Sequence, residues 1–310
     1  MANDIIRRSN RFAIVIITFN PDLETLQYFK TLATDNATSF VIDNSDQAID
    51  FSLLENEKNI RITRYGKNLG LARALDDGIE QAASDNISDI FLFDQDTRTE
   101  DDFFSNMLSF KEKHADDNYC VYAPDFLDTN SNTHAKFSVL DRFRWHTVVC
   151  DGSQTLTTTF AITSGSLIDY DIYKKIGGFD TRYFIDHIDS EYCVRAARAG
   201  YDVIINCSSL LKHAIGTRTI HSLLGLTIKP NHHNATRRYY IARNGMHMTL
   251  KHGIRYPSVV TLHIARIGHE VLSIIFYEKQ KIRKLLAMII GTFHGIIGKL
   301  GECSNRVITK

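Results

Sequence analysis

Residues 12–21 read Phe-Ala-Ile-Val-Ile-Ile-Thr-Phe-Asn-Pro. The run 12–17 is apolar and rich in β-branched side chains, which predicts a strand buried on both faces. Pro21 lacks a backbone donor and stops the strand, and a helix is expected over about 22–34. A buried strand that leads directly into a helix is typical of a parallel sheet with helices on both faces.

The same alternation continues to about residue 100. Strands are expected at 39–42, 60–65 and 90–93, and an amphipathic helix at 71–84. Polar clusters follow three of the strands, at 18–20, 43–45 and 94–96. Because ligands of such sheets bind beyond the carboxyl ends of the strands, the three clusters are expected to face one crevice.

The rest of the chain is less regular. Short strands are expected near 120–123, 158–163 and 202–205, and a helix over 189–199 that Gly200 ends. We expect a catalytic domain over 1–218, with a nucleotide-binding half in about 1–100 and an acceptor half in about 101–218. Residues 219–310 give no strand signal and are expected to be helical. The predicted fold class is therefore α/β with a C-terminal helical extension.

The composition narrows the functional class. Because 36 Lys and Arg residues balance 36 Asp and Glu residues, no general attraction to nucleic acid is expected. The N-terminal residues are basic but lack the apolar stretch of a secretory signal, which predicts a cytoplasmic protein. Five scattered cysteines without Cys-x-x-Cys spacing predict neither a disulfide framework nor a zinc site, so buried or neutral thiols are expected.

The segment 257–300 alternates apolar clusters with basic residues. Its longest uncharged stretch, 285–298, is shorter than the roughly 20 residues that span a bilayer. Two interpretations stay open. Either a helix pair lies on a membrane surface, with its apolar side in and its lysines toward anionic lipid, or the helices pack on the catalytic domain or on a second subunit.

Asp94-Gln95-Asp96 follows the expected strand 90–93. Side chains at positions i and i+2 of an extended backbone point to the same side, so the two carboxylates form a pair. Such a pair suits Mg²⁺ or Mn²⁺, which completes its shell with phosphate oxygens and water. Asp-x-Asp is also common in solvated turns, and the position directly after an apolar strand favours the metal interpretation.

Asp43-Asn44 and Lys67-Asn68-Leu69-Gly70 supply carboxylate and amide groups near the same crevice. These groups match the donor and acceptors of a uracil or thymine ring. Gly70, before an expected helix, would let the backbone approach a ligand. An Asx turn at each place is the alternative.

Asp186, Asp189 and Glu191 lie at the start of the helix over 189–199. A hydroxyl acceptor loses its proton as it attacks, and a carboxylate within hydrogen-bond reach can accept that proton. Spacing alone does not separate Asp186 from Asp189. Glu191 is equally well explained as an acid that favours the positive end of the helix dipole.

His213 and the run 237–244 supply further polar groups. An imidazole near the acid pair would complete a metal shell, although most of the 13 histidines are expected to be structural. Tyr239 and Arg243 lie four residues apart on one helix face, where the guanidinium would brace a diphosphate. A solvated basic helix face is the alternative.

Taken together, these residues resemble glycosyltransferase family 2 with the GT-A fold, and in particular the bacterial rhamnosyltransferases of O-antigen and related polysaccharides. The resemblance spans about 12–250. It rests on the order and spacing of Ile16-Ile17-Thr18-Phe19-Asn20-Pro21, Asp43-Asn44, Asn68-Leu69-Gly70-Leu71-Ala72, Asp94-Gln95-Asp96, Ser164-Gly165, Ile188-Asp189 and Arg237-Arg238-Tyr239-Tyr240 with Arg243-Asn244.

The resemblance implies a role for each position. The nucleotide would be bound by Thr18, Phe19, Asn20, Asp43, Asn44, Asn68, Gly70, Asp94 and Gln95, the diphosphate by Arg237, Arg238, Tyr239 and Arg243, and a divalent cation by Asp94, Asp96 and His213. Asp189 matches the base in the family's Glu-Asp motif, and Ile188 stands where that motif has glutamate. Glu191, Ser164 and Gly165 would lie on the acceptor side.

The resemblance also implies the reaction. The donor would be dTDP-β-L-rhamnose, inversion would give an α-L-rhamnoside, and the acceptor would be a lipid-diphosphate-linked glycan at the cytosolic membrane face. A family member that uses another nucleotide sugar, such as a UDP-hexose, and a catalytically idle nucleotide-sugar-binding protein are the alternatives. A dinucleotide oxidoreductase is disfavoured, because Thr18-Phe19-Asn20-Pro21 stands where Gly-x-Gly-x-x-Gly would be needed.

Overall fold

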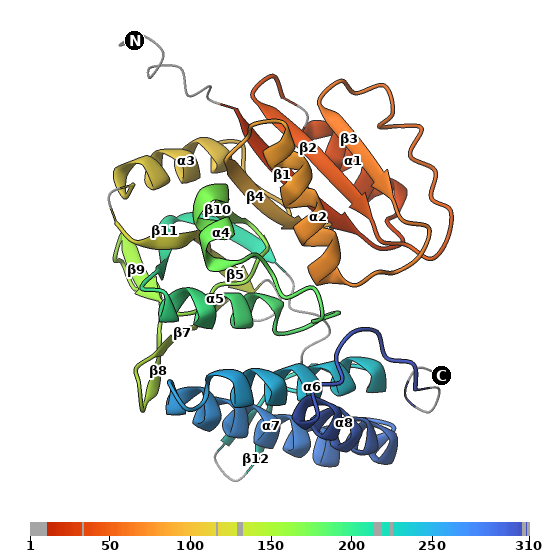
Figure 1. The fold of residues 1–310 in the computed structure, drawn as a ribbon, viewed down its shortest axis with the longest axis vertical. Coiled ribbons are helices and arrows are strands. Elements are labelled where there is room, and N and C mark those ends of the chain that lie inside the picture. Colours follow the sequence, from red (N-terminus) through yellow and green to blue (C-terminus); the bar gives the residue numbers. More distant parts are fainter. Residues whose placement is uncertain are drawn as a thin grey trace.

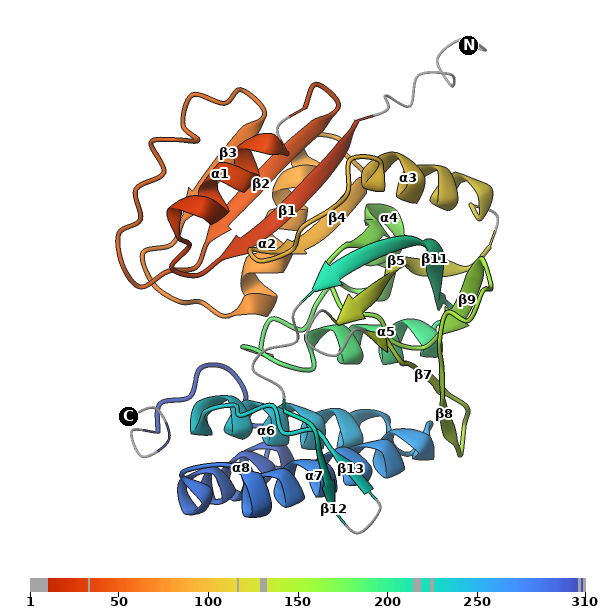
Figure 2. The same ribbon diagram turned by 180° about the vertical axis from the view of Figure 1, so that it is seen from behind.

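The computed structural model describes residues 11–305 and 308, apart from 33, 116, 129–132, 214–218 and 224–225. A mixed sheet with helices on both faces forms one part of the molecule, and a layer of three helices, α6, α7 and α8, lies along one side of it (Figures 1 and 2). The predicted α/β fold class is confirmed. The predicted division at residue 218 falls outside the described residues and stays a prediction.

The N-terminal strands form the parallel part of the sheet, in the order β3-β2-β1-β4. Their bounds are β1 Phe12–Thr18, β2 Ala37–Asp43, β3 Ile60–Arg64 and β4 Asp89–Asp94. Every residue of β1 and β2 is buried. One face packs on α2 (Leu71–Ser84), and the other on α1 (Leu23–Thr31) and α3 (Phe103–Lys113). The carboxyl ends of β1, β2 and β4 therefore lie side by side, as predicted.

The sheet continues through antiparallel and parallel strands. β10 (Ser166–Asp169) joins β4 to β5 (Tyr119–Asp128), and β11 (Asp202–His213) follows, with β9 (Thr155–Thr158) at the edge and β6 (Thr133–His134) beside β5. Helices α4 (Tyr170–Ile176) and α5 (Ile188–Arg198) lie in the same half. A separate hairpin of β7 (Phe137–Leu140) and β8 (Trp145–Val148) extends toward the helical layer (Figures 1 and 2).

Several expectations for the second half are wrong. The strand expected at 158–163 ends at Thr158, and residues 219–310 contain a short hairpin, β12 (His221–Leu223) and β13 (Leu226–Ile228), besides their helices. Helix α3 and the β7–β8 hairpin were not predicted. Strands of three or four residues are too short to show a clear period, and the described strands of these two hairpins pair with each other.

The expectation of free thiols is wrong for two cysteines. Cys150 and Cys207 form a disulfide that ties the segment after β8 to β11. Cys120, Cys193 and Cys303 are buried free thiols, as expected. The two bonded residues are far apart in the sequence, and only the tertiary fold brings them together.

The helical layer consists of α6 (Ala235–His252), α7 (Pro257–Tyr277) and α8 (Lys281–Ile296). Helix α8 lies very close to α6, because Gly291 and Gly295 face the backbone carbonyls of Tyr239 and Arg243 with no space for a Cβ atom. Among the described helices, α7 has the length and apolar composition of a membrane span, and 28% of its most apolar window is buried inside the molecule. The remaining residues of the helix are partly or fully exposed.

Candidate active site

The ends of β1 and β2 are joined through the Asp43 carboxylate. Its Oδ1 atom accepts hydrogen bonds from the Thr18 hydroxyl (3.1 Å) and from the backbone N–H of Ser45 (3.2 Å). The Ser45 hydroxyl also donates to it and in turn accepts the N–H of Asn20 at 2.7 Å. The predicted nucleotide residues Thr18, Asn20 and Asp43 are thus held in one network at the strand ends.

Asn44 and Asn68 fix the loop before α2. The Asn44 amide donates to Asn68 Oδ1 (2.9 Å) and accepts the N–H of Leu69 (2.7 Å), while Asn68 Oδ1 also accepts the N–H of Gly70 (2.9 Å). The Asx interactions considered as the alternative are therefore present. Gly70 has φ +91°, and a Cβ atom there would lie 2.8 Å from the carbonyl oxygen of Phe184, so the close approach requires glycine.

The acid pair stands at the end of β4. Gln95 accepts the N–H of Phe19 at 2.7 Å, which ties the end of β4 to the end of β1. The Asp96 side chain is exposed and Asp94 is half-buried. Ser164 lies buried behind them, where its hydroxyl bonds to that of Thr97 and accepts the N–H of Asp94 at 3.5 Å.

Gly165 lies behind the acid pair as well. Its N–H donates to the carbonyl of Leu92 at 2.7 Å, and its φ is +77°. Ser164 and Gly165 thus support the end of β4 from the interior, instead of lining an open acceptor surface.

The acid pair fits a divalent cation only in part. Within the described residues, no group of three or more His, Cys, Asp or Glu side chains is placed to hold a metal ion. The third predicted ligand, His213, ends β11, and its side chain lies outside the described residues. Two carboxylates are nonetheless enough for Mg²⁺ or Mn²⁺ when phosphate oxygens and water supply the remaining ligands.

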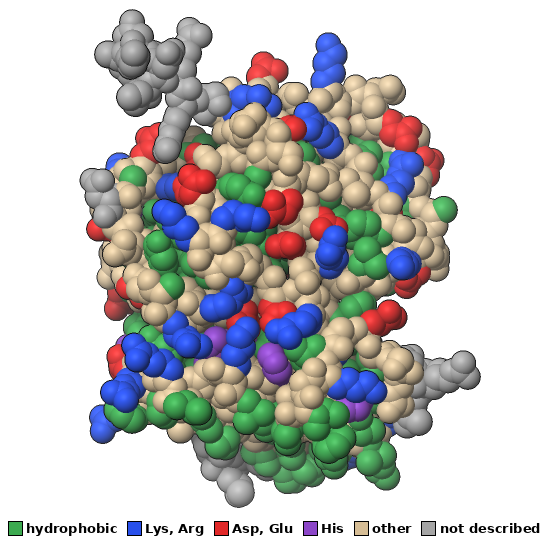
Figure 3. Space-filling model, viewed as in Figure 1, with side chains coloured by type: hydrophobic (Ala, Val, Ile, Leu, Met, Phe, Trp, Pro, Cys, Tyr) green, Lys and Arg blue, Asp and Glu red, His purple; other side chains and the backbone are tan. Residues whose placement is uncertain are grey.

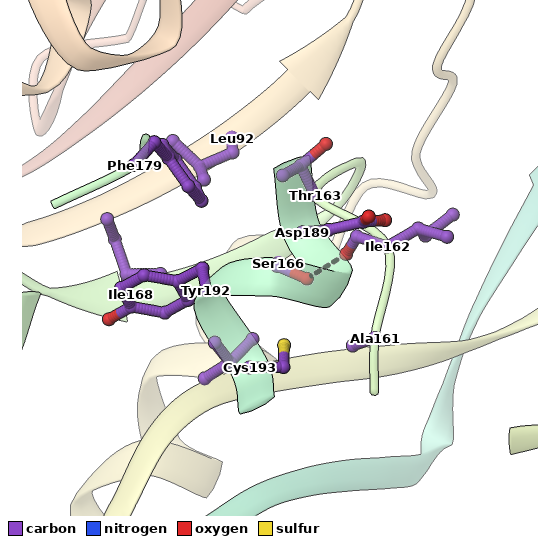
Figure 4. Close-up of a pocket in the computed structure, with 11 residues that line it drawn as sticks. Leu92, Ala161, Ile162, Thr163, Ser166, Ile168, Phe179, Asp189, Tyr192 and Cys193 are labelled. Atoms are coloured by element: carbon purple, nitrogen blue, oxygen red, sulfur yellow. Dashed lines mark hydrogen bonds between the residues drawn. The ribbon is translucent and has the colours of Figure 1, made fainter. Parts of the chain in front are cut away.

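Asp189 occupies the first turn of α5 and is half-buried. Its Oδ1 accepts the N–H of Ser190 at 2.6 Å. One side of Asp189 borders a small, largely apolar cavity of about 10 Å³, which has room for about one water molecule (Figure 4). Leu92 of β4 lines the same cavity, so Asp189 lies next to the strand that carries the acid pair.

The environment of Asp189 favours proton transfer. Burial raises the pKa of its carboxyl above the usual value, while the Ser190 N–H and the Arg266 guanidinium act in the opposite direction. A carboxylate with a raised pKa accepts a proton more readily and is a better general base near neutral pH.

Asp186 is distinguished from Asp189 by its partners. The Arg237 guanidinium pairs with the Asp186 carboxylate at 3.1 Å. Asp186 and His187 both adopt left-handed backbone conformations, with φ of 65° and 62°, which are unusual outside glycine. The Asn244 amide holds this turn by donating to the carbonyls of Ile185 (2.8 Å) and Asp186 (2.9 Å). Asp186 is thus engaged in an ion pair, whereas within the described residues the hydrogen bonds of Asp189 join one of its oxygens to Ser190 in its own helix turn.

Glu191 lies in the interface between α5 and α6. It is fully buried and accepts hydrogen bonds from Arg195 (3.1 Å), Lys251 (2.8 Å) and His252 (3.3 Å). Burial by itself would raise the pKa of Glu191, yet the bonds from His252, Arg195 and Lys251 hold that pKa well below its usual value. The structure therefore places Glu191 in a buried ion cluster that joins the two layers.

Three of the four predicted diphosphate residues also lie inside the helical layer. Arg238 is fully buried and pairs with Glu270 and Glu278. The Tyr239 hydroxyl bonds His294 at 2.7 Å, and Arg243 donates to the side chain of Asn244 at 2.8 Å. Arg237, whose side chain is 46% exposed, is the one of the four that lies at the surface, where it pairs with Asp186.

Comparisons with known proteins show the family of this chain. Residues 13–177 match the profile of glycosyl transferase family 2. The chain is 27% identical over 296 residues to the dTDP-rhamnosyl transferase RfbF of Shigella flexneri, covering 94% of this chain and 97% of that protein. The structure of S. aureus TarS 1-349 superposes with a TM-score of 0.58 at 10% identity, over 93% of this chain and 82% of that chain.

A second solved structure, GalNAc-T7 with UDP, GalNAc and Mn2+, superposes with a TM-score of 0.50 at 14% identity, over 84% of this chain and 54% of that chain. This chain thus spans about half the length of that protein, and at such low identity the two structures show a shared fold alone. The chain belongs to glycosyl transferase family 2, and it is a glycosyltransferase.

We predict that Glu191→Gln destabilises the fold. The substitution leaves three cationic or hydrogen-bonding partners around an uncharged, buried amide, and breaking a buried ion pair typically costs about 3–5 kcal/mol. Denaturant unfolding followed by circular dichroism measures this loss. The exposed helix acid Glu24 is the matched control, because Glu24→Gln should change stability by less than about 0.5 kcal/mol.

The same variant tests where Glu191 acts. A Glu191→Gln protein with unchanged stability and an altered acceptor KM would place this residue at the acceptor instead of in the layer interface.

Proposed function

We propose that the protein is an inverting rhamnosyltransferase that uses dTDP-β-L-rhamnose as its donor. The observation that carries the proposal is the position of Asp189, which has a raised pKa and shares a cavity with the strand that ends in the acid pair. A proton acceptor and a phosphate-binding edge are the two parts that a single displacement at a sugar carbon needs. Similarity to a dTDP-rhamnosyl transferase supports this donor over a UDP-hexose.

The donor would occupy the edge formed by the ends of β1, β2 and β4. The nucleoside lies against the network of Thr18, Asn20 and Asp43. Asp94 and Asp96 would hold a divalent cation, Mg²⁺ or Mn²⁺, which would supply positive charge for the leaving diphosphate. Arg237, at the surface beside Asp186, is the residue placed to add a second positive charge.

The reaction is a single displacement with inversion. Asp189 accepts the proton of the acceptor hydroxyl as the oxygen forms its bond to the anomeric carbon. The bond from that carbon to the diphosphate oxygen breaks, and dTDP leaves from the opposite face. The apolar cavity on the inner side of Asp189 keeps bulk water away from the carboxylate and maintains its basicity.

We further propose that the acceptor is a lipid-linked glycan and that the protein works at the cytoplasmic face of the membrane. The outer face of α8 carries an apolar stripe of exposed side chains: Ile282, Leu286, Ile289, Phe293 and Ile296. Exposed Ile264, Ile275 and Phe276 of α7 add to it. Figure 3 shows hydrophobic side chains gathered along this edge of the molecule, below a band of basic ones.

The charges around the stripe favour lipid over a second copy of the chain. Exposed Lys279, Lys281 and Lys299 stand at its two ends, and the sequence 281–297 contains no acidic residue. Two copies would bring these lysines together, which is unfavourable, whereas an anionic bilayer surface attracts each basic residue by about 1 kcal/mol.

The disulfide between Cys150 and Cys207 is of a kind that is uncommon in cytosolic proteins.

Two substitutions test the role of Asp189 and the role of the donor edge independently. Asp189→Asn should retain metal-dependent dTDP binding and lose transfer by about 10²- to 10⁴-fold, because only the proton acceptor is removed. Asp96→Asn should weaken dTDP binding in Mn²⁺ and leave the weak metal-free binding unchanged. Calorimetry with dTDP, with and without Mn²⁺, and a transfer assay with dTDP-rhamnose and UDP-hexoses measure both effects.

Transfer at the wild-type rate by Asp189→Asn would move the base elsewhere, and Asp186→Asn would then be the next variant. Equal dTDP affinity of the wild type and Asp96→Asn in Mn²⁺ would remove the metal role. Binding of dTDP by a wild-type protein that turns over none of the nucleotide sugars would favour the idle binding protein.

The membrane face is tested by sedimentation with vesicles. The protein should sediment with phosphatidylglycerol vesicles at low salt and much less at high salt or with phosphatidylcholine alone. Ile289→Glu should abolish sedimentation, whereas Leu23→Glu, at a residue 65% exposed on α1, should not. A soluble dimer that Ile289→Glu dissociates, without vesicle binding, would assign the face to a second copy.

A further inference from the structure

A cavity of about 440 Å³ lies between the two layers of the molecule. Its walls come from β8, from the start of α5, from α6, from α7 and from the segment that follows β13. The volume is that of a typical small-ligand site. Hydrogen bonds join the elements around the cavity. The N–H of Ser258 in α7 donates to the carbonyl oxygen of Arg142 in the β7–β8 turn (3.2 Å), and the N–H of Lys229 donates to Nε2 of His269 (3.1 Å).

Part of the wall suits a sugar ring. Trp145 lines the cavity from the first position of β8 and is 36% exposed, so part of this large aromatic residue is accessible to a ligand. His187 and His263 pack together over Gly245, where a Cβ atom would lie 2.6 Å from His263 Cε1 and 3.1 Å from His187 Nε2. Burial lowers the pKa of His187 to about 3 and that of His263 to about 4. Both imidazoles are therefore neutral at physiological pH. The His187 ring already bonds the backbone of Ile241, which leaves its other ring nitrogen as an acceptor for a hydroxyl group, while a neutral His263 ring has one donor and one acceptor.

The cavity also carries positive charge. Arg266 and Lys229 line it, and its one acid, Glu270, is already paired with the buried Arg238. A cationic pair beside an aromatic ring and neutral imidazoles matches a saccharide that bears a phosphate. A purely neutral glycan would leave the charge of Arg266 in a partly desolvated site without a partner on the ligand.

The cavity is connected to the proposed base. Arg266 acts electrostatically on the Asp189 carboxylate, and His187 stands two residues before it at the start of α5. Arg266 also lies over the ring of Phe160, at 5.8 Å, next to Ala161, which lines the small cavity on the inner side of Asp189. Arg266 therefore lines the large cavity and also lies close enough to Asp189 to act on the charge of its carboxylate.

We propose that this cavity is the acceptor site, in which Trp145 packs against the acceptor sugar while Arg266 and Lys229 bind the phosphate that links the sugar to its carrier. The proposal rests on the proposed transferase function. It adds α7 and the segment after β13 to acceptor recognition, beside Trp145, which lies in the acceptor half expected over 101–218. One side of α7 would then line the sugar-binding cavity. Its other side, where Ile264 is exposed, would face the carrier lipid.

Trp145 is the single tryptophan of the chain and serves as the reporter. Two probes are titrated below their micelle concentrations while its fluorescence is followed: N-acetylglucosamine linked to an undecyl chain through a diphosphate, and undecyl N-acetylglucosaminide without phosphate. The diphosphate probe should give a saturable change and bind more tightly than the glycoside. Arg266→Gln should weaken the affinity for the diphosphate probe about tenfold to hundredfold, the range expected for a lost hydrogen bond to a charged group. The affinity for the glycoside should change little.

Lys229→Gln is the second variant, and it serves as the test if Arg266→Gln does not fold. It should also weaken binding of the diphosphate probe. Arg255→Gln, at an exposed arginine between α6 and α7, is the matched control and should leave both probes unchanged. The affinity for dTDP in Mn²⁺ should be the same in all variants.

Different results would overturn the acceptor-site proposal and the proposed transferase function. A wild-type protein that binds dTDP but gives no saturable fluorescence change, or a change that neither Arg266→Gln nor Lys229→Gln weakens, overturns the acceptor site alone. Displacement of the diphosphate probe by dTDP would assign the cavity to the donor. Absence of dTDP binding would instead reject the proposed function.

Discussion

The contact between Gly70 and Phe184 joins the two halves of the site. Because Gly70 has no Cβ atom, the chain at Phe184 approaches closely enough for its carbonyl to accept the N–H of Leu71 at 2.7 Å. Gly70 belongs to the loop that Asn44 and Asn68 fix at the strand ends, and Phe184 begins the turn that leads to Asp189. One close backbone approach thus joins the loop at the strand ends to the turn that leads to Asp189, the proposed base.

The helical layer holds that turn from the other side. Asn244 bonds the carbonyls of Ile185 and Asp186, and the buried Glu191 cluster anchors the following helix to α6. These contacts keep two left-handed, non-glycine residues in place immediately before α5, and such backbone strain is commonly stored at functional sites. Of the polar residues in 237–244, Asn244 and Arg237 therefore contact the turn before Asp189, whereas Arg238 and Tyr239 bond to partners within the helical layer.

The sequence predicts one half of the molecule much better than the other. Residues 12–94 form buried strands and an amphipathic helix with clear periods, so the sheet and the meeting of Thr18, Asp43 and Asp94 at one edge could be predicted. The partners of Arg238, Arg243 and Glu191 could not, because a helical spacing does not reveal whether a charged face meets solvent or an ion pair. The cavity around Arg266 joins separate parts of the chain, and no local pattern indicates it.

The central claim is that the diphosphate edge and Asp189 act on one sugar carbon from opposite faces. The configuration of the new glycosidic bond measures this directly, and the one-bond coupling between the anomeric carbon and its hydrogen in the NMR spectrum of the product reports that configuration. The account predicts an α-linked rhamnose from a β-linked donor. A β-linked product, with the donor's configuration retained, would contradict it.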